Sequence, residues 1–312
     1  MKKIKAGYYG FLVGDAMGVP LEFASREELV KRPVTTMLEN ENYKLPAGSW
    51  SDDSSMLIAT MSSIMAKKQV DCRDIMEKII EWIDFGKYTS TGEAFDIGRT
   101  CLKAVERYKT GIPVIEAGME GINFNGNGSL VRMIPIAFYA FMTKMTEDEI
   151  IDMVCDVSSL THRHEISCLG CYILARYTMF LLEGFDAFAS YEKIKKLDYS
   201  AFADESIKAY ERLLFDNVID YSLNNISSTG YVVDTLEAVI WCVCNTENFE
   251  QAVIGAINLG GDADTIGALT GALAGIIYGY DDIPKAWINK LQKRDYLKLV
   301  YVSFIKTLNN LD

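Results

Sequence analysis

The chain has 312 residues, with 31 Lys or Arg against 43 Asp or Glu, which gives a formal net charge of −12. A hydrophobic fraction of 49% with only 6 prolines excludes a disordered, collagen-like or linker-rich chain. Because the charge is negative and no run of five Lys or Arg residues occurs, we expect no nucleic-acid partner and no membrane partner.

The cysteines and the apolar segments indicate the compartment. Seven cysteines are too few for a disulfide scaffold, and Cys168 and Cys171 lack the second ligand pair of a zinc finger, so we interpret all seven as buried free thiols. Residues 1–13 resemble a weak signal peptide, but Asp15 ends the apolar stretch and no small-residue cleavage site follows. The most apolar segment, 266–280, is shorter than the ~20 residues of a membrane span. We therefore expect a soluble, cytoplasmic protein.

Apolar residues recur at the three- and four-residue spacing of amphipathic helices along most of the chain. The spacing predicts helices over residues 56–65, 74–85, 147–160, 172–182, 206–218, 234–244, 249–259 and 266–278. Thr146 and Glu149 have the capping-box spacing at the start of one of them. No long linker and no repeat of 20–50 residues is visible. We therefore predict one all-α domain over residues 1–312.

A first acidic motif, Ser51-Asp-Asp-Ser54, lies where a loop enters a predicted helix. Carboxylates at a helix N-terminus are stabilised by free amides and by the helix dipole, so capping explains either aspartate alone. Asp52 and Asp53 together exceed what capping requires, and they repel each other unless a cation lies between them.

A second acidic motif, Gly260-Gly-Asp-Ala-Asp-Thr265, also precedes a predicted helix. Asp262 and Asp264 alternate around one residue, so an extended backbone would direct both to one side. The Gly/Ala stripe that follows is typical of tight helix packing. Taken together, the two motifs form an all-oxygen ligand set of the kind that Mg²⁺ or Mn²⁺ prefers, and two ions can share one carboxylate.

Three weaker motifs remain open between a structural and a functional interpretation. The Gly-rich loop at the start of 125–132 is a common turn before a helix, but its amides also suit a phosphate. His162 and His164, the only histidines, either satisfy the last carbonyls of a helix or contact a ribose or base. Glu22 is either a solvated glutamate or a mobile acid beside Gly18 and Pro20.

The order of these motifs resembles the ADP-ribosylglycohydrolase family. The matching blocks are Gly14-Asp-Ala-Met-Gly18 with Glu22, Ser51–Ser54, Gly126–Gly128 with Arg132, Thr161-His162 and Gly260–Gly267, supported by Asp96–Gly98 and Ser228–Glu237. They span residues 6–280, and the Gly-Gly-Asp-Ala-Asp-Thr block is the most specific of them.

The resemblance implies a compact, orthogonal all-α helical bundle with two Mg²⁺ or Mn²⁺ ions. Separately, we expect the protein to be a monomer. The implied metal ligands are Ser51, Asp52, Asp53, Asp262, Asp264 and Thr265. The implied substrate is an ADP-ribosylated protein or a small ADP-ribosylated molecule, with arginine as the first choice of acceptor. The implied substrate contacts are Gly126, Asn127, Gly128 and Ser129 for the pyrophosphate, His162 and Tyr231 for the adenosine, and Asp96 for the acceptor guanidinium.

The implied reaction is cleavage of a glycosidic bond with oxocarbenium character, assisted by a metal-bound water. Glu22, Asp53 and Asp264 are the candidate catalytic acids, and the sequence does not choose among them. Departures from the family pattern are small at the metal site, where serine replaces threonine and keeps the hydroxyl. Leu130 would narrow the pyrophosphate pocket, and the residues after His162 differ on the adenosine side.

Two alternatives use the same residues. A metal-dependent nucleotide phosphohydrolase would release phosphate instead of ADP-ribose. A catalytically inactive member, kept as an ADP-ribose-binding or structural protein, would be expected to have lost metal ligands. All six implied ligand positions still carry oxygen-bearing side chains, which ranks the inactive member last.

Overall fold

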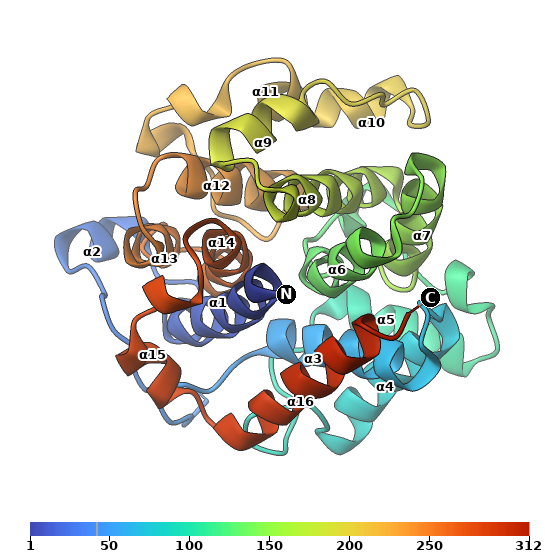
Figure 1. Cartoon of the computed structure of the whole chain (residues 1–312), viewed down its shortest axis with the longest axis horizontal. Coiled ribbons are helices and arrows are strands. Elements are labelled where there is room, and N and C mark those ends of the chain that lie inside the picture. The colour runs from blue at the N-terminus through green and yellow to red at the C-terminus, as the bar shows by residue number, and fades with distance from the viewer. Residues whose placement is uncertain (42, 312) are drawn as a thin grey trace.

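The computed structural model describes residues 1–41 and 43–311, and helices joined by short loops account for most of them (Figure 1). The α-helices are α1 (Lys2–Gly18), α2 (Arg26–Lys31), α3 (Asp52–Lys67), α4 (Cys72–Phe85), α5 (Arg99–Lys109), α6 (Met133–Thr143), α7 (Glu147–Ser159), α8 (Glu165–Glu183), α9 (Ala187–Ile194), α10 (Asp204–Ala209), α11 (Glu211–Leu214), α12 (Val232–Cys244), α13 (Phe249–Ile257), α14 (Ala263–Tyr278), α15 (Lys285–Lys290) and α16 (Arg294–Leu308). Within the described residues there is no strand, only three isolated β-bridges. The all-α prediction is confirmed.

The predicted helix over 206–218 is wrong in its extent. Two short helices, α10 and α11, occupy this region, with a break at Tyr210 and an end at Leu214. Tyr210 is fully buried, and its hydroxyl donates a hydrogen bond to the carbonyl of Ile166 in α8. We attribute the break to this tertiary anchor, which overrides the local helical spacing.

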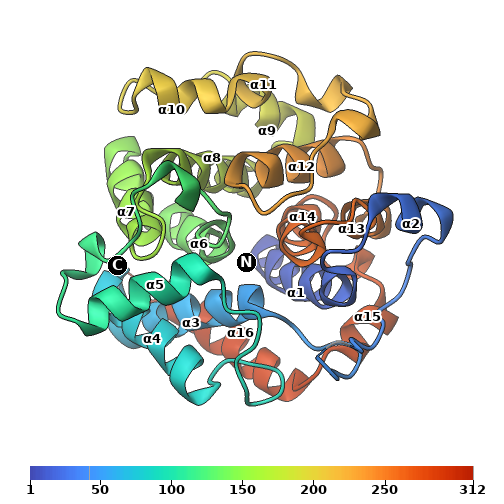
Figure 2. The ribbon, with the colours of Figure 1, turned by 180° about the vertical axis from the view of Figure 1, so that it is seen from behind.

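Two central helices from opposite ends of the chain, α1 and α14, lie side by side (Figures 1 and 2). Their glycines face each other so closely that a Cβ atom on Gly10 would lie 2.1 Å from the carbonyl oxygen of Gly271. A Cβ on Gly14 would lie 1.9 Å from the carbonyl oxygen of Gly267. The small-residue stripe therefore packs backbone against backbone, as the sequence predicts for a helix at the centre of a bundle.

Helix α8 is the one helix in the described residues that is long and apolar enough to cross a membrane. Of its most apolar 18-residue window, 89% is buried inside the protein, where α8 packs against α6, α7 and α12. Such burial is typical of a core helix.

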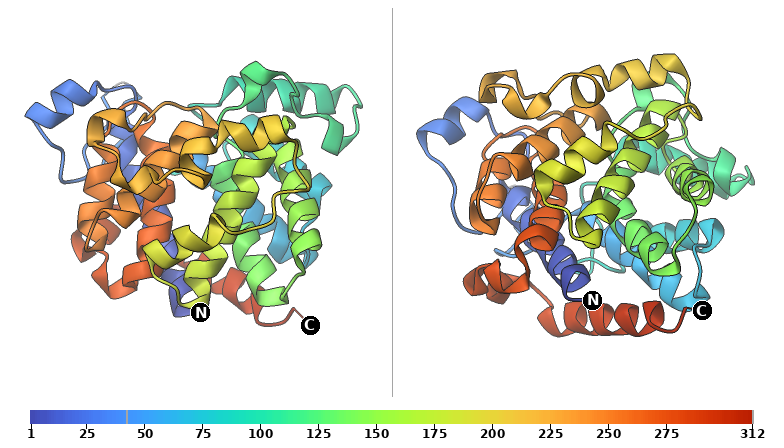
Figure 3. Two further views of the ribbon diagram at one scale, coloured as in Figure 1. Left: turned by 90° about the horizontal axis from the view of Figure 1, so that it is seen from above. Right: turned by 45° about the horizontal axis from the view of Figure 1, so that its top comes forward.

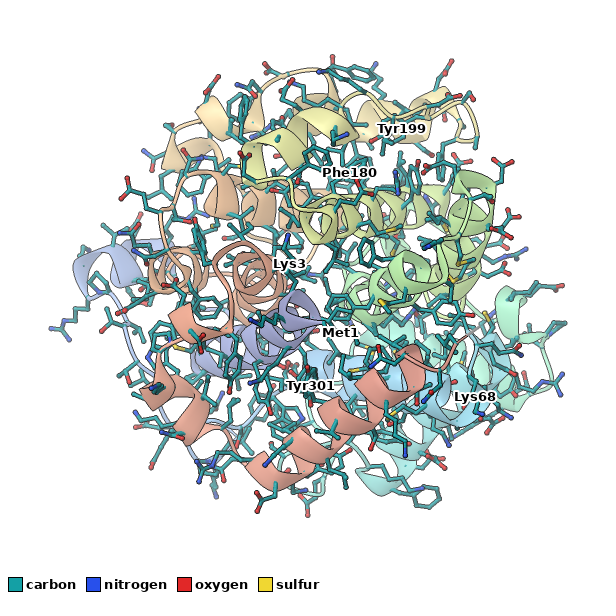
Figure 4. The ribbon with its side chains drawn as sticks, in the orientation of Figure 1. Met1, Lys3, Lys68, Phe180, Tyr199 and Tyr301 are labelled. Carbon is teal, nitrogen blue, oxygen red and sulfur yellow. The ribbon has the colours of Figure 1, made fainter. Side chains whose placement is uncertain are left out.

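Both termini lie on the same side of the molecule, opposite α2 and the segment that follows α5 (Figure 3, left). The N-terminal turn of α1 is held there by Lys3, whose ammonium donates to the carbonyl of Leu181 at the end of α8. Tyr301 of α16 stacks on Tyr8 with ring centroids 5.9 Å apart (Figure 4). Since α1 begins at this anchored side, its C-terminal end points away from the two termini.

Candidate active site

A cleft of about 240 Å³ lies where the end of α1, the N-termini of α3, α5 and α14, and the loop before α6 come together. It is lined by Glu22, Phe23, Asp52, Asp53, Met56, Asp96, Gly98, Arg99, Thr100, Cys101, Gly126, Asn127, Gly128, His162, Asp262, Asp264 and Thr265. The structure thus brings the predicted site residues together, except Ser51, Ser129 and Tyr231, which do not line the cleft.

One side of the cleft is acidic, and we call it the carboxylate wall: Glu22, Asp52, Asp53, Asp96, Asp262 and Asp264. Carboxylate oxygens of Glu22, Asp96 and Asp264 lie within 4.8 Å of one another. Burial, followed by repulsion from Asp96, raises the pKa of Glu22 to about 8. Burial and neighbouring aspartates also raise the pKa of Asp53 and of Asp264 well above the ordinary value. Burial and the neighbouring carboxylates therefore disfavour the charged forms of these side chains.

The carboxylate wall contains polar atoms that the protein itself leaves without partners. Oδ2 of Asp53 and Oδ1 of Asp264 are buried and have no hydrogen-bond partner in the described part of the chain. Buried carboxylate oxygens are costly unless a donor or a cation satisfies them. An all-oxygen set with unpaired inward atoms fits Mg²⁺ or Mn²⁺. Glu22 and Asp96 lie within range of such an ion as well, which the six predicted ligands did not include.

The segment that carries Asp52 and Asp53 is held by a residue that sequence reasoning missed. Asp15 is fully buried in α1, and its carboxylate accepts hydrogen bonds from the backbone amides of Ser51 and Ser54, both at 3.0 Å, and from the Ser54 hydroxyl. The Ser51 hydroxyl caps α3 by accepting from the amide of Asp53. Asp15 lies inside the Gly14–Gly18 block, and that position was the available signal.

A second group of residues lines the cleft, and we call it the glycine wall: Gly126, Asn127, Gly128 and His162. The Asn127 amide group donates to Oδ2 of Asp262 at 2.7 Å and to the Thr235 hydroxyl at 2.9 Å. Backbone hydrogen bonds from the Asn127 amide to Gly230 and from the Val232 amide to Asn125 fix the loop to the start of α12. The glycine wall is therefore held by its own hydrogen bonds before any ligand arrives.

Two of the predicted pyrophosphate and adenosine contacts lie outside the lining. The Ser129 hydroxyl is fully buried and accepts a hydrogen bond from the Cys171 thiol at 3.2 Å. Tyr231 is 37% exposed and forms a β-bridge with Gly126. It therefore lies beside the cleft, where it stays a predicted adenosine contact.

The structural interpretation of the histidines is wrong in its detail, because neither side chain satisfies the last carbonyls of a helix in the described residues. His164 is the N-cap of α8, where its Nδ1 accepts from the amide of Ile166 at 3.3 Å. His162 lines the cleft, and a Cβ on Gly128 would lie 3.2 Å from its ring. Burial, with a further contribution from Arg132, lowers the pKa of His162 to about 3. The imidazole is therefore neutral throughout the physiological pH range.

The N-terminus of α5 forms a second backbone surface of the cleft that the sequence analysis did not find. Gly98, Arg99, Thr100 and Cys101 line the cleft, and no side chain caps the free amides of this helix. Free amides at a helix N-terminus suit a phosphate group. The N-cap position holds Gly98 and not Ser, Thr or Asp, so the sequence does not clearly mark where this helix begins.

The mouth of the cleft holds an exposed aromatic side chain in a strained position. Phe23 is 79% exposed and has a φ of 62°, in the left-handed region that non-glycine residues rarely adopt. Its amide donates to the carbonyl of Gly261 at 2.7 Å, and the amide of Gly261 donates to Ala24 at 3.1 Å. Asp96, which also lines the cleft, has a left-handed backbone too, with a φ of 56°.

A family model described as ADP-ribosylglycohydrolase matches residues 1–309. The chain belongs to the ADP-ribosylglycohydrolase family. The resemblance expected from the sequence motifs is thereby confirmed, and the family membership identifies the chain as a hydrolase that acts on N- or O-glycosyl bonds.

Relatives and a solved structure agree with this family. The chain is 34% identical over 299 residues to an ADP-ribosylarginine hydrolase Tri1 of Serratia proteamaculans, covering 95% of this chain and 76% of that protein. It is 29% identical over 295 residues to an ADP-ribosyl-[dinitrogen reductase] glycohydrolase of Rhodospirillum rubrum, covering 92% and 89%. A solved ADP-ribosylglycohydrolase-related protein complex has a TM-score of 0.81 at 25% identity and covers 98% of both chains.

Proposed function

We propose that this ADP-ribosylglycohydrolase removes ADP-ribose from arginine side chains and depends on divalent cations. The observation that carries the proposal is the pair of buried, unpartnered carboxylate oxygens on Asp53 and Asp264, in one cleft with the glycine wall. Arginine is supported by the acidic mouth, because a guanidinium binds carboxylates with directed hydrogen bonds. It is also supported by the name of the Serratia relative, an ADP-ribosylarginine hydrolase.

Asp52, Asp53, Asp262, Asp264 and Thr265 would hold the cations, which we propose to be two Mg²⁺ or Mn²⁺ ions. All five line the cleft, and the Ser51 hydroxyl stays a predicted ligand next to them. When bound, such ions would orient the distal ribose hydroxyls and lower the pKa of a water.

The proton for the departing nitrogen is assigned to Glu22 and Asp96. Carboxylate oxygens of Glu22 and Asp96 lie within 4.8 Å of each other, and burial followed by repulsion from Asp96 raises the pKa of Glu22 to about 8, so Glu22 would carry the proton near neutral pH. In the reaction, a water oxygen forms a bond to the anomeric carbon while the carbon–nitrogen bond breaks. The leaving guanidine nitrogen takes up a proton, and the water loses one to a carboxylate of the wall.

The rest of the substrate would lie along backbone amides. We propose that the pyrophosphate binds between the glycine wall and the free amides of Arg99 and Thr100 at the N-terminus of α5. The adenosine would extend past His162 toward Tyr231. The exposed ring of Phe23 would contact the acceptor guanidinium or its peptide at the mouth.

The test is ADP-ribose release from an ADP-ribosyl-arginine protein, measured with Mg²⁺, with Mn²⁺ and with a chelator. We expect release that requires a cation, together with strong loss in Glu22→Gln and Asp264→Asn. A parallel ADP-ribosyl-serine substrate tests the acceptor. Release of inorganic phosphate instead of ADP-ribose would favour a nucleotide phosphohydrolase and contradict the proposal.

We further propose that the protein works as a cytoplasmic monomer on ADP-ribosylated protein or a small ADP-ribosylated molecule. All seven cysteines are free thiols, which suits a reducing compartment. Light scattering during gel filtration and cell fractionation test these two statements. A stable dimer, or recovery in an oxidising compartment, would contradict them.

A further inference from the structure

The side of His162 that faces away from the cleft rests on a buried hydroxyl. Nδ1 of His162 lies 2.8 Å from Oγ1 of Thr161, and both residues are buried. Either atom of this pair can donate, depending on which ring nitrogen carries the hydrogen. The tautomer of His162 is therefore decided by what else the Thr161 hydroxyl contacts.

The other contact of this hydroxyl is a donor. Nη2 of Arg132 donates to Oγ1 of Thr161 at 2.5 Å, and Arg132 is itself fully buried. The remaining hydrogen bonds of the guanidinium go to the carbonyls of Val157, Ser158 and Gly128 and to Sδ of Met56, and it forms no ion pair in the described part of the chain. A guanidinium has no acceptor atom, so it cannot receive the hydrogen of the Thr161 hydroxyl.

Nδ1 of His162 is thus the one acceptor that the described structure offers to the Thr161 hydroxyl. If Nδ1 carried a hydrogen instead, the buried hydroxyl would accept twice and its own hydrogen would have no partner, which buried polar groups avoid. A doubly protonated ring would meet the same obstacle, and the buried charge of Arg132 would oppose it further.

We propose that Arg132 and Thr161 are positioning residues that hold His162 as a neutral ring with its hydrogen on Nε2, so that it presents one fixed donor to the cleft. The relay runs from the guanidinium through the hydroxyl to Nδ1. The inference rests on the proposed function for its ligand, since the acceptor atom would be a phosphate or ribose oxygen of ADP-ribose.

The glycine wall is shaped for this ring. A Cβ atom on Gly126 would lie 3.4 Å from Nε2 of His162, and one on Gly128 would lie 3.2 Å from Cε1. Nε2 itself has no hydrogen-bond partner within residues 1–41 and 43–311, and the ring lines the cleft. The glycines therefore leave the ring room between them, and they leave the donor free for a ligand. A neutral donor also forms no ion pair with the carboxylate wall, which remains available to cations.

The tautomer can be read directly, because the chain has only two histidines. In a long-range ¹H–¹⁵N spectrum of the full chain near pH 7, we expect the His162 ring to show a pyridine-like Nδ1 and a pyrrole-like Nε2. His164 can show the same pattern, because its Nδ1 accepts a hydrogen bond from the Ile166 amide. His164→Asn, which keeps a capping residue on α8, assigns the signal to His162. A pyrrole-like Nδ1 on His162 in the wild-type protein, or a doubly protonated ring, would overturn the proposal without any variant.

The relay is tested with Thr161→Val, which removes the hydroxyl, against Thr161→Ser, which keeps it. We expect the valine variant to lose the pure Nε2–H tautomer and to raise KM about tenfold with little change in kcat, as for the loss of one directed hydrogen bond. The serine variant should match the wild type in both readouts. A valine variant with an unchanged tautomer would overturn the relay.

The ligand contact is tested by adding ADP-ribose, AMP or inorganic pyrophosphate to the wild-type protein while the His162 signals are followed. We expect ADP-ribose to shift Nε2 and to leave Nδ1 hydrogen-bonded. The two fragments then show whether the acceptor lies on the pyrophosphate or on the adenosine. An Nε2 signal that does not change when ADP-ribose is added would overturn the proposed contact between His162 and the ligand. Hydrolysis measured on the same sample distinguishes that failure from a failure of the proposed function.

Discussion

The two walls of the cleft are built by opposite rules. On the glycine wall, Asn127 and His162 have protein partners that fix them, and the loop is anchored to the start of α12. On the carboxylate wall, Asp53 and Asp264 each have a buried oxygen with no partner in the described residues, and burial raises the pKa of both. The glycine wall is thus fixed in place by protein hydrogen bonds, whereas the carboxylate wall has buried oxygens that a cation would satisfy.

This difference indicates which wall determines substrate affinity and which determines metal binding and turnover. The glycine wall offers neutral donors that bind a ligand without rearrangement, so substitutions on this wall should change substrate affinity. The unpaired oxygens of Asp53 and Asp264 suit a cation, so substitutions there should change metal affinity and turnover. Each of the following predictions would break or sharpen this contrast.

The largest effect is expected at the carboxylate wall itself. Asp264→Asn keeps the shape of the side chain but removes the charge, and we expect kcat to fall by about 10³-fold, in the range of losing a catalytic or metal-binding group. Asp295→Asn, on the exposed first turn of α16, is the matched control and should be silent. A higher KM with an unchanged kcat would show that Asp264 acts in substrate binding, which would contradict this prediction.

The next largest effect is expected at Asp15, which holds the segment that carries Asp52 and Asp53. Asp15→Asn weakens the buried acceptor that holds the amides of Ser51 and Ser54, so we expect Mg²⁺ or Mn²⁺ affinity to fall about 10–100-fold, as for other groups that orient ligands. Calorimetric titration with Mn²⁺ measures this. Unchanged cation affinity, with normal folding by circular dichroism, would show that Asp15 does not position the ligands.

Metal-free protein should lose stability as pH rises. Burial raises the folded-state pKa of Asp15 to about 6, above the ordinary value of an unfolded aspartate near 3.9. The folded state thus binds more protons between pH 4 and 6, so the free energy of unfolding should be highest below pH 4 and fall by roughly 3 kcal/mol as pH passes 6. Urea unfolding in chelator measures the slope, which Asp15→Asn should flatten.

The smallest effect is expected on the glycine wall. Gly128→Ala would bring a Cβ within 3.2 Å of the His162 ring, so we expect KM to rise about fivefold while kcat stays within about twofold. Gly255→Ala is the matched control, because its Cβ meets nothing within 4 Å, and it should stabilise α13 by about 0.5–1 kcal/mol. A loss of kcat in Gly128→Ala would erase the contrast between the walls.

The sequence predicted the residues of the carboxylate wall better than the residues that hold the cleft in shape. Asp52, Asp53, Asp262 and Asp264 stand in short motifs whose charge density is visible locally. Asp15 could not be assigned, because its partners lie 36 and 39 residues away along the chain and only the fold brings them together. The same holds for Arg132 and Thr161, which are 29 residues apart.

Helix prediction failed where the surroundings override the local pattern. Helix α1 is buried on nearly all sides, so it shows no polar stripe by which an amphipathic helix is recognised. The break at Tyr210 depends on a hydrogen bond to α8 that no local spacing reports. The N-terminus of α5, with no side-chain cap, lacked the residue types that mark a helix start.

The close approach of α1 and α14 has a consequence for how the protein is made. Gly10 and Gly271 touch through their backbones, yet 261 residues separate them along the chain, so one leaves the ribosome long before the other. Contacts between such distant parts of a chain close slowly, and the apolar face of α1 has no partner until they do. We therefore expect the cleft to be completed only after most of the chain has been synthesised, so a nascent chain halted before α14 should be inactive and in need of a chaperone.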